Sequence, residues 1–156
     1  MGYDNTQIAR LFIEEILSKG NFDVMEEIVG KDIVVRDNLA PEGRGQEHLK
    51  SQVREYRTAF PDLTFTIEDV LQTTGDRVIV QWRARGTHRG PLFGIAPTNR
   101  SATTTGVDVM RIMNGKIVEG TSYWNAYAVF SQLGLVPALD QLGKAAKGGG
   151  VRPEAR

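Results

Sequence analysis

Two histidines are candidates for acid–base chemistry. His88 ends a predicted strand on the face it shares with Trp82, just before Gly90. There the imidazole would project into the mouth of a pocket as an acid, a base or an orienting donor. The alternative is a rim histidine bonded to a loop carbonyl. His48 lies early in a predicted helix and is most simply a solvated helix residue.

A second candidate pair is Arg111 and Asn125, on the two strands of a predicted hairpin. An arginine and an amide inside an apolar cavity need each other or a ligand as partners, because burying them unpaired is costly. That pairing favours binding of a substrate oxyanion. In the alternative, Arg111 lies on the solvated face and pairs with Asp108 or Glu119.

Asp37 is a third candidate, because its carboxylate follows a short β-rich segment, although an aspartate beside Asn38 also forms turns without any function. We expect the substrate to be contacted by five apolar and aromatic residues: Trp82, Phe93, Val109, Tyr123 and Trp124.

Composition excludes several classes of function. The chain has 156 residues and no cysteine, which rules out thiol nucleophiles and Cys-ligated metal sites, and it lacks a phosphate-binding loop, a Gly-x-Ser-x-Gly elbow and paired histidines at metal spacing. Nineteen basic and nineteen acidic residues give no net field for nucleic acid. No apolar run is long enough to span a membrane and no leader is recognisable, so we expect a cytoplasmic protein.

Helical periodicity dominates the first sixty residues. Apolar residues recur at helical spacing over residues 8–17, and Asn21 is a plausible N-cap for a short helix that Gly30 closes. A short strand is predicted over residues 32–36, followed by a loop of turn residues. A third helix is predicted over residues 49–60, stopped by Pro61.

After Pro61 the period changes to 2, which predicts strands. One strand carries Val78, Val80, Trp82 and Ala84 on one face, another covers residues 102–112, and Asn114-Gly115 predicts a hairpin into a last strand that runs to about Tyr127. We expect a single domain over residues 1–143 and a disordered tail over residues 144–156.

Three helices followed by a meander of strands leave no crossover helices for a doubly wound sheet. We therefore predict an α+β fold in which a curved, mostly antiparallel sheet wraps on three N-terminal helices as a cone-shaped barrel with a hydrophobic pocket. The opposite face, with Ile79 and Met110, is expected to form a homodimer.

Several blocks of sequence resemble the SnoaL-like polyketide cyclase family. The segment Gly-Thr-His-Arg-Gly-Pro-Leu-Phe-Gly-Ile-Ala-Pro-Thr-Asn-Arg over residues 86–100 is similar to the family's Gly-Thr-His … Gly-Ile-Pro-Pro-Thr-Gly-Arg segment. Gly-Lys-Ile-Val-Glu at 115–119, and Gln-Leu-Gly at 132–134 followed by Pro137, match two further family blocks. Ala-Phe-Pro-Asp at 59–62 and the turn at 75–78 extend the similarity to nearly the whole chain before Pro137.

The resemblance implies a nuclear-transport-factor-like α+β barrel, a hydrophobic cavity, oligomers, and no metal or organic cofactor. It also implies that a carboxylate removes a proton next to a carbonyl of an aromatic polyketide, so that a ring closes by aldol addition. Counting back from Gln132, the family's catalytic aspartate falls at Asn125, and its supporting histidine falls at Arg111. An amide cannot act as a general base.

These changes give the hypothesis of an anthracycline-type polyketide-tailoring enzyme, a cyclase-like hydroxylase or an aldol cyclase. Asp37 or His88 would transfer protons, Arg111 and Asn125 would bind an oxyanion, and a redox partner would serve a hydroxylase. The alternatives are a non-catalytic binding protein for an apolar metabolite and an adaptor dimer.

Overall fold

The N-terminal helix confirms the helical pattern of residues 8–17. In the computed structural model, which describes residues 2–147, α1 (Asn5–Leu11) runs directly into a π-helix, η1 (Phe12–Leu17). Asp4 and Gln7 form a capping box at its start. The helix ends before Gly20, whose φ of 68° is a conformation that glycine adopts without steric penalty.

The second helix is shorter than predicted. Helix α2 (Met25–Ile28) is preceded by Val24, while the Asn21 side chain accepts a bond from the backbone of Asp23. Gly30 does not close the helix, because strand β1 (Val29–Asp37) has already begun and Val29 pairs with Ile117.

The predicted loop after β1 contains an edge strand. Strand β2 (Ala40–Arg44) pairs antiparallel with β1, and an edge position tolerates Pro41, which has no N–H to donate. Helix α3 (Gln46–Ala59) follows and confirms the third predicted helix, with Leu49 and Val53 buried.

Four long strands complete the sheet: β3 (Thr64–Gln72), β4 (Arg77–Thr87), β5 (Ser101–Met113) and β6 (Lys116–Trp124). The strand order is β2-β1-β6-β5-β4-β3, and only the β1–β6 pair is parallel. Asn114 and Gly115 both have positive φ between β5 and β6, as a tight hairpin turn requires. The prediction of an α+β fold with a mostly antiparallel sheet is confirmed.

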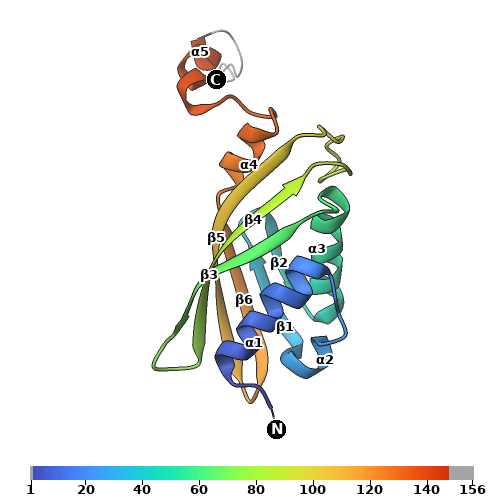
Figure 1. Ribbon diagram of the computed structural model, residues 1–156, viewed down its shortest axis with the longest axis vertical. Helices are drawn as coiled ribbons and strands as arrows, with labels where there is room; N and C mark the ends of the chain where they lie inside the picture. Colours follow the sequence, from blue (N-terminus) through green and yellow to red (C-terminus); the bar gives the residue numbers. More distant parts are fainter. Residues whose placement is uncertain (1, 148–156) are drawn as a thin grey trace, which may run out of the picture.

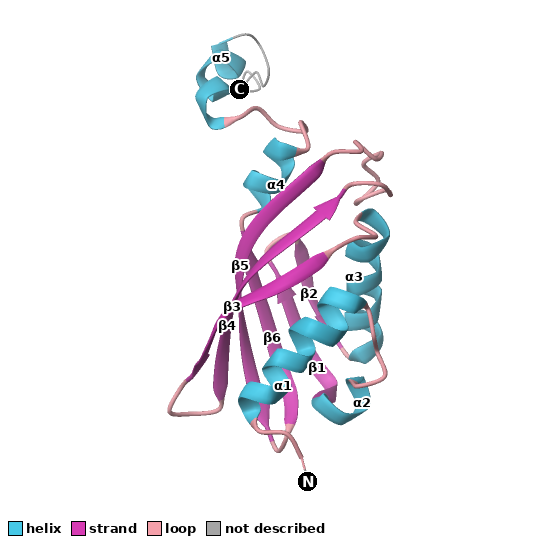
Figure 2. Cartoon of the chain, viewed as in Figure 1, coloured by secondary structure: helices cyan, strands magenta, loops and turns pink. Residues whose placement is uncertain are grey.

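Helices α1, α2 and α3 and the π-helix η1 pack on one face of this sheet, here called the inner face (Figure 2). As predicted, β4 turns Val78, Val80, Trp82 and Ala84 inward, where all four are buried. Met110 was predicted on the opposite, outer face, and this is wrong. Met110, on β5, pairs with the inward-facing Val78 of β4 and therefore points to the same side of the sheet. It is 0% exposed and belongs to the core.

The chain after β6 is helical rather than extended. Strand β6 ends at Trp124, short of the predicted Tyr127, because α4 (Ala126–Gln132) begins there. A 3-10 turn, η2 (Leu139–Gln141), leads into α5 (Leu142–Lys147). The predicted tail begins inside α5, and its remainder, residues 148–156, lies outside the described residues, so the domain boundary stays a prediction.

Several chain segments meet at one end of the sheet (Figure 1). The end of α3, the loop over residues 88–100 and α4 all lie there, around the inner-face ends of the central strands. Within residues 2–147, no helix is long and apolar enough to cross a membrane.

Candidate functional site

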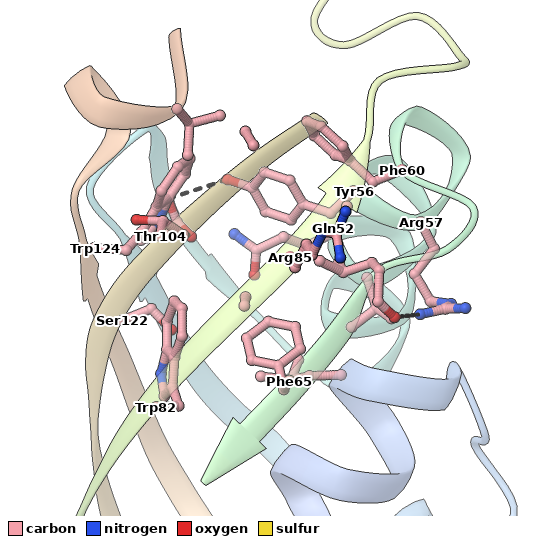
Figure 3. Close-up of a pocket in the computed structure, with 18 residues that line it drawn as sticks. Gln52, Tyr56, Arg57, Phe60, Phe65, Trp82, Arg85, Thr104, Ser122 and Trp124 are labelled. Carbon is pink, nitrogen blue, oxygen red and sulfur yellow. Dashed lines mark hydrogen bonds between the residues drawn. The ribbon is translucent and has the colours of Figure 1, made fainter. Parts of the chain in front are cut away.

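A partly open pocket of about 110 Å³ lies at this end, between α3 and the inner face (Figure 3). Most of its lining is apolar, and the aromatic side chains come from α3, its C-cap and three strands: Tyr56, Phe60, Phe65, Trp82 and Trp124. Of the lining residues that the structure describes, Asp37 is the one with a carboxylate.

Asp37 is held by hydrogen bonds from three donors. Its Oδ1 accepts from the backbone N–H of Leu39 at 2.8 Å and from the Tyr56 hydroxyl at 3.2 Å. The Trp124 indole N–H lies 3.3 Å from both carboxylate oxygens. Oδ2 therefore carries only a shared contact, which leaves it free to accept a proton or a hydrogen bond from a ligand.

Helix α3 presents Gln52 and Tyr56 to the pocket one turn apart. The Tyr56 ring stands edge-on to Trp124, with centroids 6.0 Å apart. Burial, followed by the charge of Asp37, raises the pKa of the Tyr56 phenol above its usual value, so Tyr56 stays a neutral donor. The Gln52 carboxamide makes no hydrogen bond to any described residue.

Two residues that line the pocket, Trp82 and Ser122, both donate hydrogen bonds to a second acid, Asp108, which lies behind them. The Trp82 indole N–H donates to Oδ1 at 2.9 Å, and the Ser122 hydroxyl donates to the same oxygen at 2.7 Å. Gly106 on β5 makes this possible, because a Cβ there would collide with the Trp82 ring and lie 2.8 Å from the Tyr123 carbonyl oxygen.

Asp108 is 3% exposed, and burial raises its pKa to about 6, with a smaller contribution from the charge of Asp37. Sequence reasoning considered Asp108 only as a surface partner of Arg111. Its parity with Ile112, which is buried on the same strand, is the signal that could have placed it inside.

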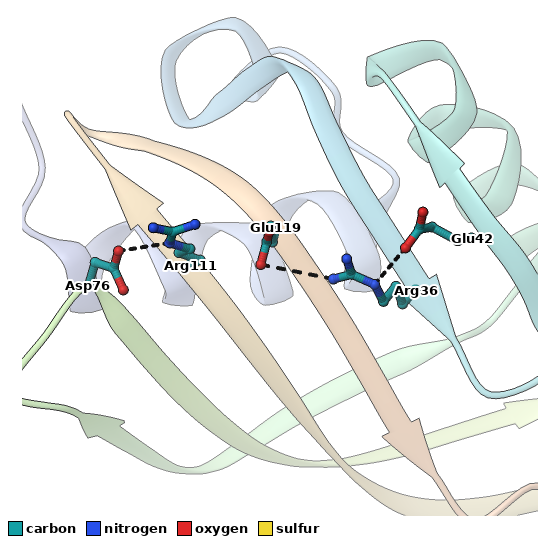
Figure 4. Close-up of polar contacts among 5 residues, drawn as sticks. All are labelled: Arg36, Glu42, Asp76, Arg111 and Glu119. Carbon is teal, nitrogen blue, oxygen red and sulfur yellow. Dashed lines mark hydrogen bonds and ion pairs between the residues drawn. The ribbon is translucent and has the colours of Figure 1, made fainter.

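Arg111 lies on the outer face, so its predicted role in the pocket is wrong (Figure 4). Its guanidinium donates to Asp76 at 2.8 Å, and this bond holds the pKa of the Asp76 carboxyl below its usual value. The alternative of a solvated arginine holds, with Asp76 as the partner and Glu119 as its cross-strand neighbour. Strand alternation explains this, because Met110 and Ile112 on either side point inward.

The predicted substrate contacts divide in the same way. Trp82 and Trp124 line the pocket, but Val109 and Tyr123 lie on the outer face, with Tyr123 60% exposed, and for them the prediction is wrong. Phe93 does not line the pocket. It is 48% exposed at the tip of the 88–100 loop, and its ring stands edge-on to Tyr56 at 5.9 Å.

Asn125 caps α4 rather than lining the pocket. Its side-chain oxygen accepts from the backbone N–H of Ala128 at 3.0 Å, and the residue is exposed. A helix N-cap uses this oxygen for the helix itself. The predicted placement of Asn125 against a substrate oxyanion is therefore wrong.

His88 holds the 88–100 loop and does not reach the pocket. The ring is 0% exposed and packs on Phe60, and Nδ1 accepts from the backbone N–H of Thr98 at 3.2 Å. Its predicted projection into the pocket mouth is wrong. The rim alternative describes it better, although the partners are a loop N–H and a hydroxyl rather than a carbonyl. His48 packs over Gly43 of β2.

No group of three or more His, Cys, Asp or Glu side chains within residues 2–147 is arranged to hold a metal ion. The arrangement in the pocket instead suits proton transfer. It combines a carboxylate with a free oxygen and largely apolar, aromatic walls, against which a flat ligand can pack.

Comparison with known proteins places this geometry in a family. A family model described as SnoaL-like polyketide cyclase matches residues 7–133. Among curated proteins, no sequence matches the chain significantly.

Solved structures share the fold. A candidate SnoaL-like polyketide cyclase from Jannaschia sp. CCS1 is 20% identical, with a TM-score of 0.76 over 88% of this chain and 99% of its own. IdmH, a candidate polyketide cyclase from Streptomyces antibioticus, is 27% identical, with a TM-score of 0.70 over 84% and 99%. AclR, a candidate hydroxylase from Streptomyces galilaeus, is 21% identical, with a TM-score of 0.72 over 93% and 92%.

The family model spans most of the chain, and the helices, sheet order and pocket agree with the resemblance noted in the sequence. The chain belongs to the SnoaL-like polyketide cyclase family and has its nuclear-transport-factor-like α+β fold.

Proposed function

We propose that the chain is an enzyme of aromatic polyketide biosynthesis that removes a proton next to a substrate carbonyl, with Asp37 as the base. The observation that carries the proposal is the Asp37 carboxylate, set in an apolar aromatic pocket with Oδ2 free to accept a proton. Membership of a polyketide cyclase family supports the substrate class.

In the reacting step, Oδ2 of Asp37 takes a proton from the carbon next to the carbonyl, and the electron pair of that C–H bond forms an enolate. In an aldol closure, the enolate carbon attacks a second carbonyl of the same molecule, and the new alkoxide takes a proton from the protonated Asp37, which returns to its carboxylate form. Tyr56 and Trp124 keep Asp37 in place through their hydrogen bonds.

The pocket holds only part of an anthracycline-type substrate. Its volume of about 110 Å³ is below the roughly 300–1,000 Å³ of pockets that enclose drug-sized ligands. We therefore place the reacting end of the polyketide beside Asp37 and the remaining rings at the open mouth.

Aldol closure is the first candidate reaction, and IdmH, a candidate cyclase 27% identical to this chain, favours it. Hydroxylation is the second, because AclR, a candidate hydroxylase, aligns over 93% of the chain. Hydroxylation would also need oxygen and a reductant, supplied by a redox partner.

An anthraquinone that carries a 3-oxoester side chain tests both reactions. Aldol addition gives a product of unchanged mass with one more ring, whereas hydroxylation gives a product one oxygen atom heavier. We expect the first product from the protein alone. Asp37→Asn should reduce turnover by roughly 100-fold or more, the scale of general base catalysis. Arg111→Ala, on the outer face, is the matched control and should turn over like the parent.

Unreduced turnover in Asp37→Asn would contradict the proposal. Tight binding without any product, with or without a reductase and oxygen, would support the non-catalytic binding protein instead. Failure to bind aromatic ligands at all would leave the adaptor dimer. Independently of the reaction, we propose that two copies of the chain form a homodimer through the outer face, which carries Ile79, Val109 and Tyr123.

A further inference from the structure

Asp108 is an acid that the fold buries without a cation. No basic side chain within residues 2–147 forms an ion pair with it. Both of its hydrogen bonds, from Trp82 and Ser122, come to the single oxygen Oδ1. A buried charge in such surroundings is costly, and the group responds by holding its proton more tightly.

The two inner acids lie in one row across three strands. Asp37 of β1 pairs with Ser122 of β6, and Ser122 pairs with Asp108 of β5. Adjacent strands are about 4.8 Å apart, so the Cα atoms of Asp37 and Asp108 are separated by roughly 10 Å, with Ser122 between them. Ser122 lines the pocket, and Asp108 lies behind it.

We propose that Asp108, acting through the Ser122 hydroxyl, supplies the hydrogen bond that stabilises the substrate enolate while Asp37 removes the proton. Protonated Asp108 donates its O–H to Ser122 Oγ, which frees the Ser122 O–H to donate to the carbonyl oxygen where negative charge develops. Ser122 is then a catalytic residue and Asp108 a positioning residue. The inference rests on the proposed function, since it needs an enolate.

Ionisation of Asp108 reverses the direction of this hydrogen bond. The carboxylate is an acceptor only, so the Ser122 hydroxyl turns back to it, as in the 2.7 Å bond. The site therefore offers a donor to the substrate when Asp108 is neutral and an acceptor when it is charged. Two acids in unequal environments divide the base and acid roles in this way.

The side chains that face Asp108 are one acid, two neutral hydrogen-bond donors and an apolar core. Strand β1 contributes the charge of Asp37, which opposes ionisation of Asp108, and β4 and β6 contribute the neutral donors Trp82 and Ser122. The helices packed on the inner face contribute apolar side chains to the surrounding core: Ile8, Phe12, Ile13, Ile16, Leu49 and Val53. Burial accordingly raises the pKa of Asp108 to about 6.

The test uses 2-tetralone, an aromatic ketone with a CH₂ group between its ring and its carbonyl, and follows protein-dependent exchange of that CH₂ with deuterated solvent by NMR. For the parent protein we expect exchange to fall as pH rises through about 6, where Asp108 ionises. Ser122→Ala should lower the exchange rate roughly 100-fold, the effect of losing an oxyanion donor. Ser122→Thr, which keeps the hydroxyl, should restore exchange.

Asp108→Asn is the decisive variant, because an amide does not ionise in this pH range and, with its NH₂ group turned toward Ser122, donates to that hydroxyl at every pH. The Trp82 N–H, which shares the same oxygen in the parent, then loses its acceptor. We expect the decline near pH 6 to disappear while exchange at low pH is kept. A decline unchanged in Asp108→Asn, or full exchange in Ser122→Ala, would overturn the inference. Asp37→Asn separates the two claims. Exchange that needs Asp37 but ignores Asp108 and Ser122 leaves the proposed function intact, whereas exchange that ignores Asp37 removes both.

Discussion

The same strands carry polar residues on both faces of the sheet, and the two sets differ in their partners. The inner acid row consists of Asp37, Ser122 and Asp108. The outer ion-pair row contains acids and arginines in alternation (Figure 4): Asp76, Arg111, Glu119, Arg36 and Glu42.

In the outer ion-pair row each charge has an opposite neighbour in contact with solvent, at N–O distances from 2.7 to 3.9 Å. Exposed pairs of this kind contribute little to stability and leave no group with unusual reactivity. On the inner face the acids have donors but no cation, and the surroundings are apolar. Acids without a cation in apolar surroundings are typical of functional sites, and this difference supports the role proposed for the inner acid row.

The largest expected effect is on the pH dependence of stability. The pKa of Asp108 is about 6 in the fold and 3.8 in its ordinary state, so the folded protein binds the extra proton between these values. Stability should therefore fall as pH rises from about 4 to 6, by on the order of 3 kcal/mol from this group. Urea unfolding at a series of pH values, compared between the parent and Asp108→Asn, measures it.

Asp108→Asn should lack this loss, since an amide does not titrate there. Equal pH dependence in the two proteins would show that Asp108 ionises as a surface group does, and the contrast between the rows would weaken.

The next largest effect on stability is expected from removing a hydrogen-bond donor to Asp108. Trp82→Phe keeps the aromatic packing against Phe65 but removes the N–H that reaches Asp108. We expect a loss of about 2 kcal/mol at neutral pH, because a hydrogen bond to a charged group is removed, and a smaller loss at pH 4, where Asp108 is neutral. A loss that is the same at both values would assign it to packing alone.

A smaller effect is expected on the outer ion-pair row. Arg111→Ala removes the partner of Asp76 in a solvent-exposed pair. We expect the free energy of unfolding measured in urea to change little, and to change less still in high salt, which screens the pair. A large, salt-independent loss would mean that the outer pairs are structural.

The smallest effect on folding is expected from Tyr123→Asp, which changes an exposed outer-face side chain and nothing in the pocket. If the outer face joins two copies of the chain, sedimentation velocity should show a dimer for the parent and a monomer for the variant. A parent that sediments as a monomer at high concentration would remove the dimer proposal.

The sequence predicted the helices and strands well because their hydrophobic periods are regular, but it misjudged which face of β5 is buried. Thr104, Gly106 and Asp108 point inward, while Val107 and Val109 point outward. Over this part of β5, beside the candidate site, the polar and small residues are therefore on the buried face and the apolar residues on the outer face, the reverse of the usual alternation. Functional sites break local patterning in this way, and only the pairing with β4 resolves it.

The prediction for Asn125 failed for a different reason. Counting residues along the chain located it near the pocket, but the strand ends at Trp124 and the next residue becomes a helix cap. Asp37 became a candidate because of its position after the predicted first strand. Its aromatic partners come from α3 and β6, far away in the sequence, and no local pattern connects them.

The most direct test of the contrast is deuterium exchange into 2-tetralone by Asp37→Asn and Arg111→Ala, measured beside the parent with binding of the ketone checked in each. We predict that Asp37→Asn binds the ketone but exchanges it at least roughly 100-fold more slowly. Arg111→Ala should match the parent. Exchange that survives in Asp37→Asn, or that is lost in Arg111→Ala, would contradict the assignment of the chemistry to the inner face.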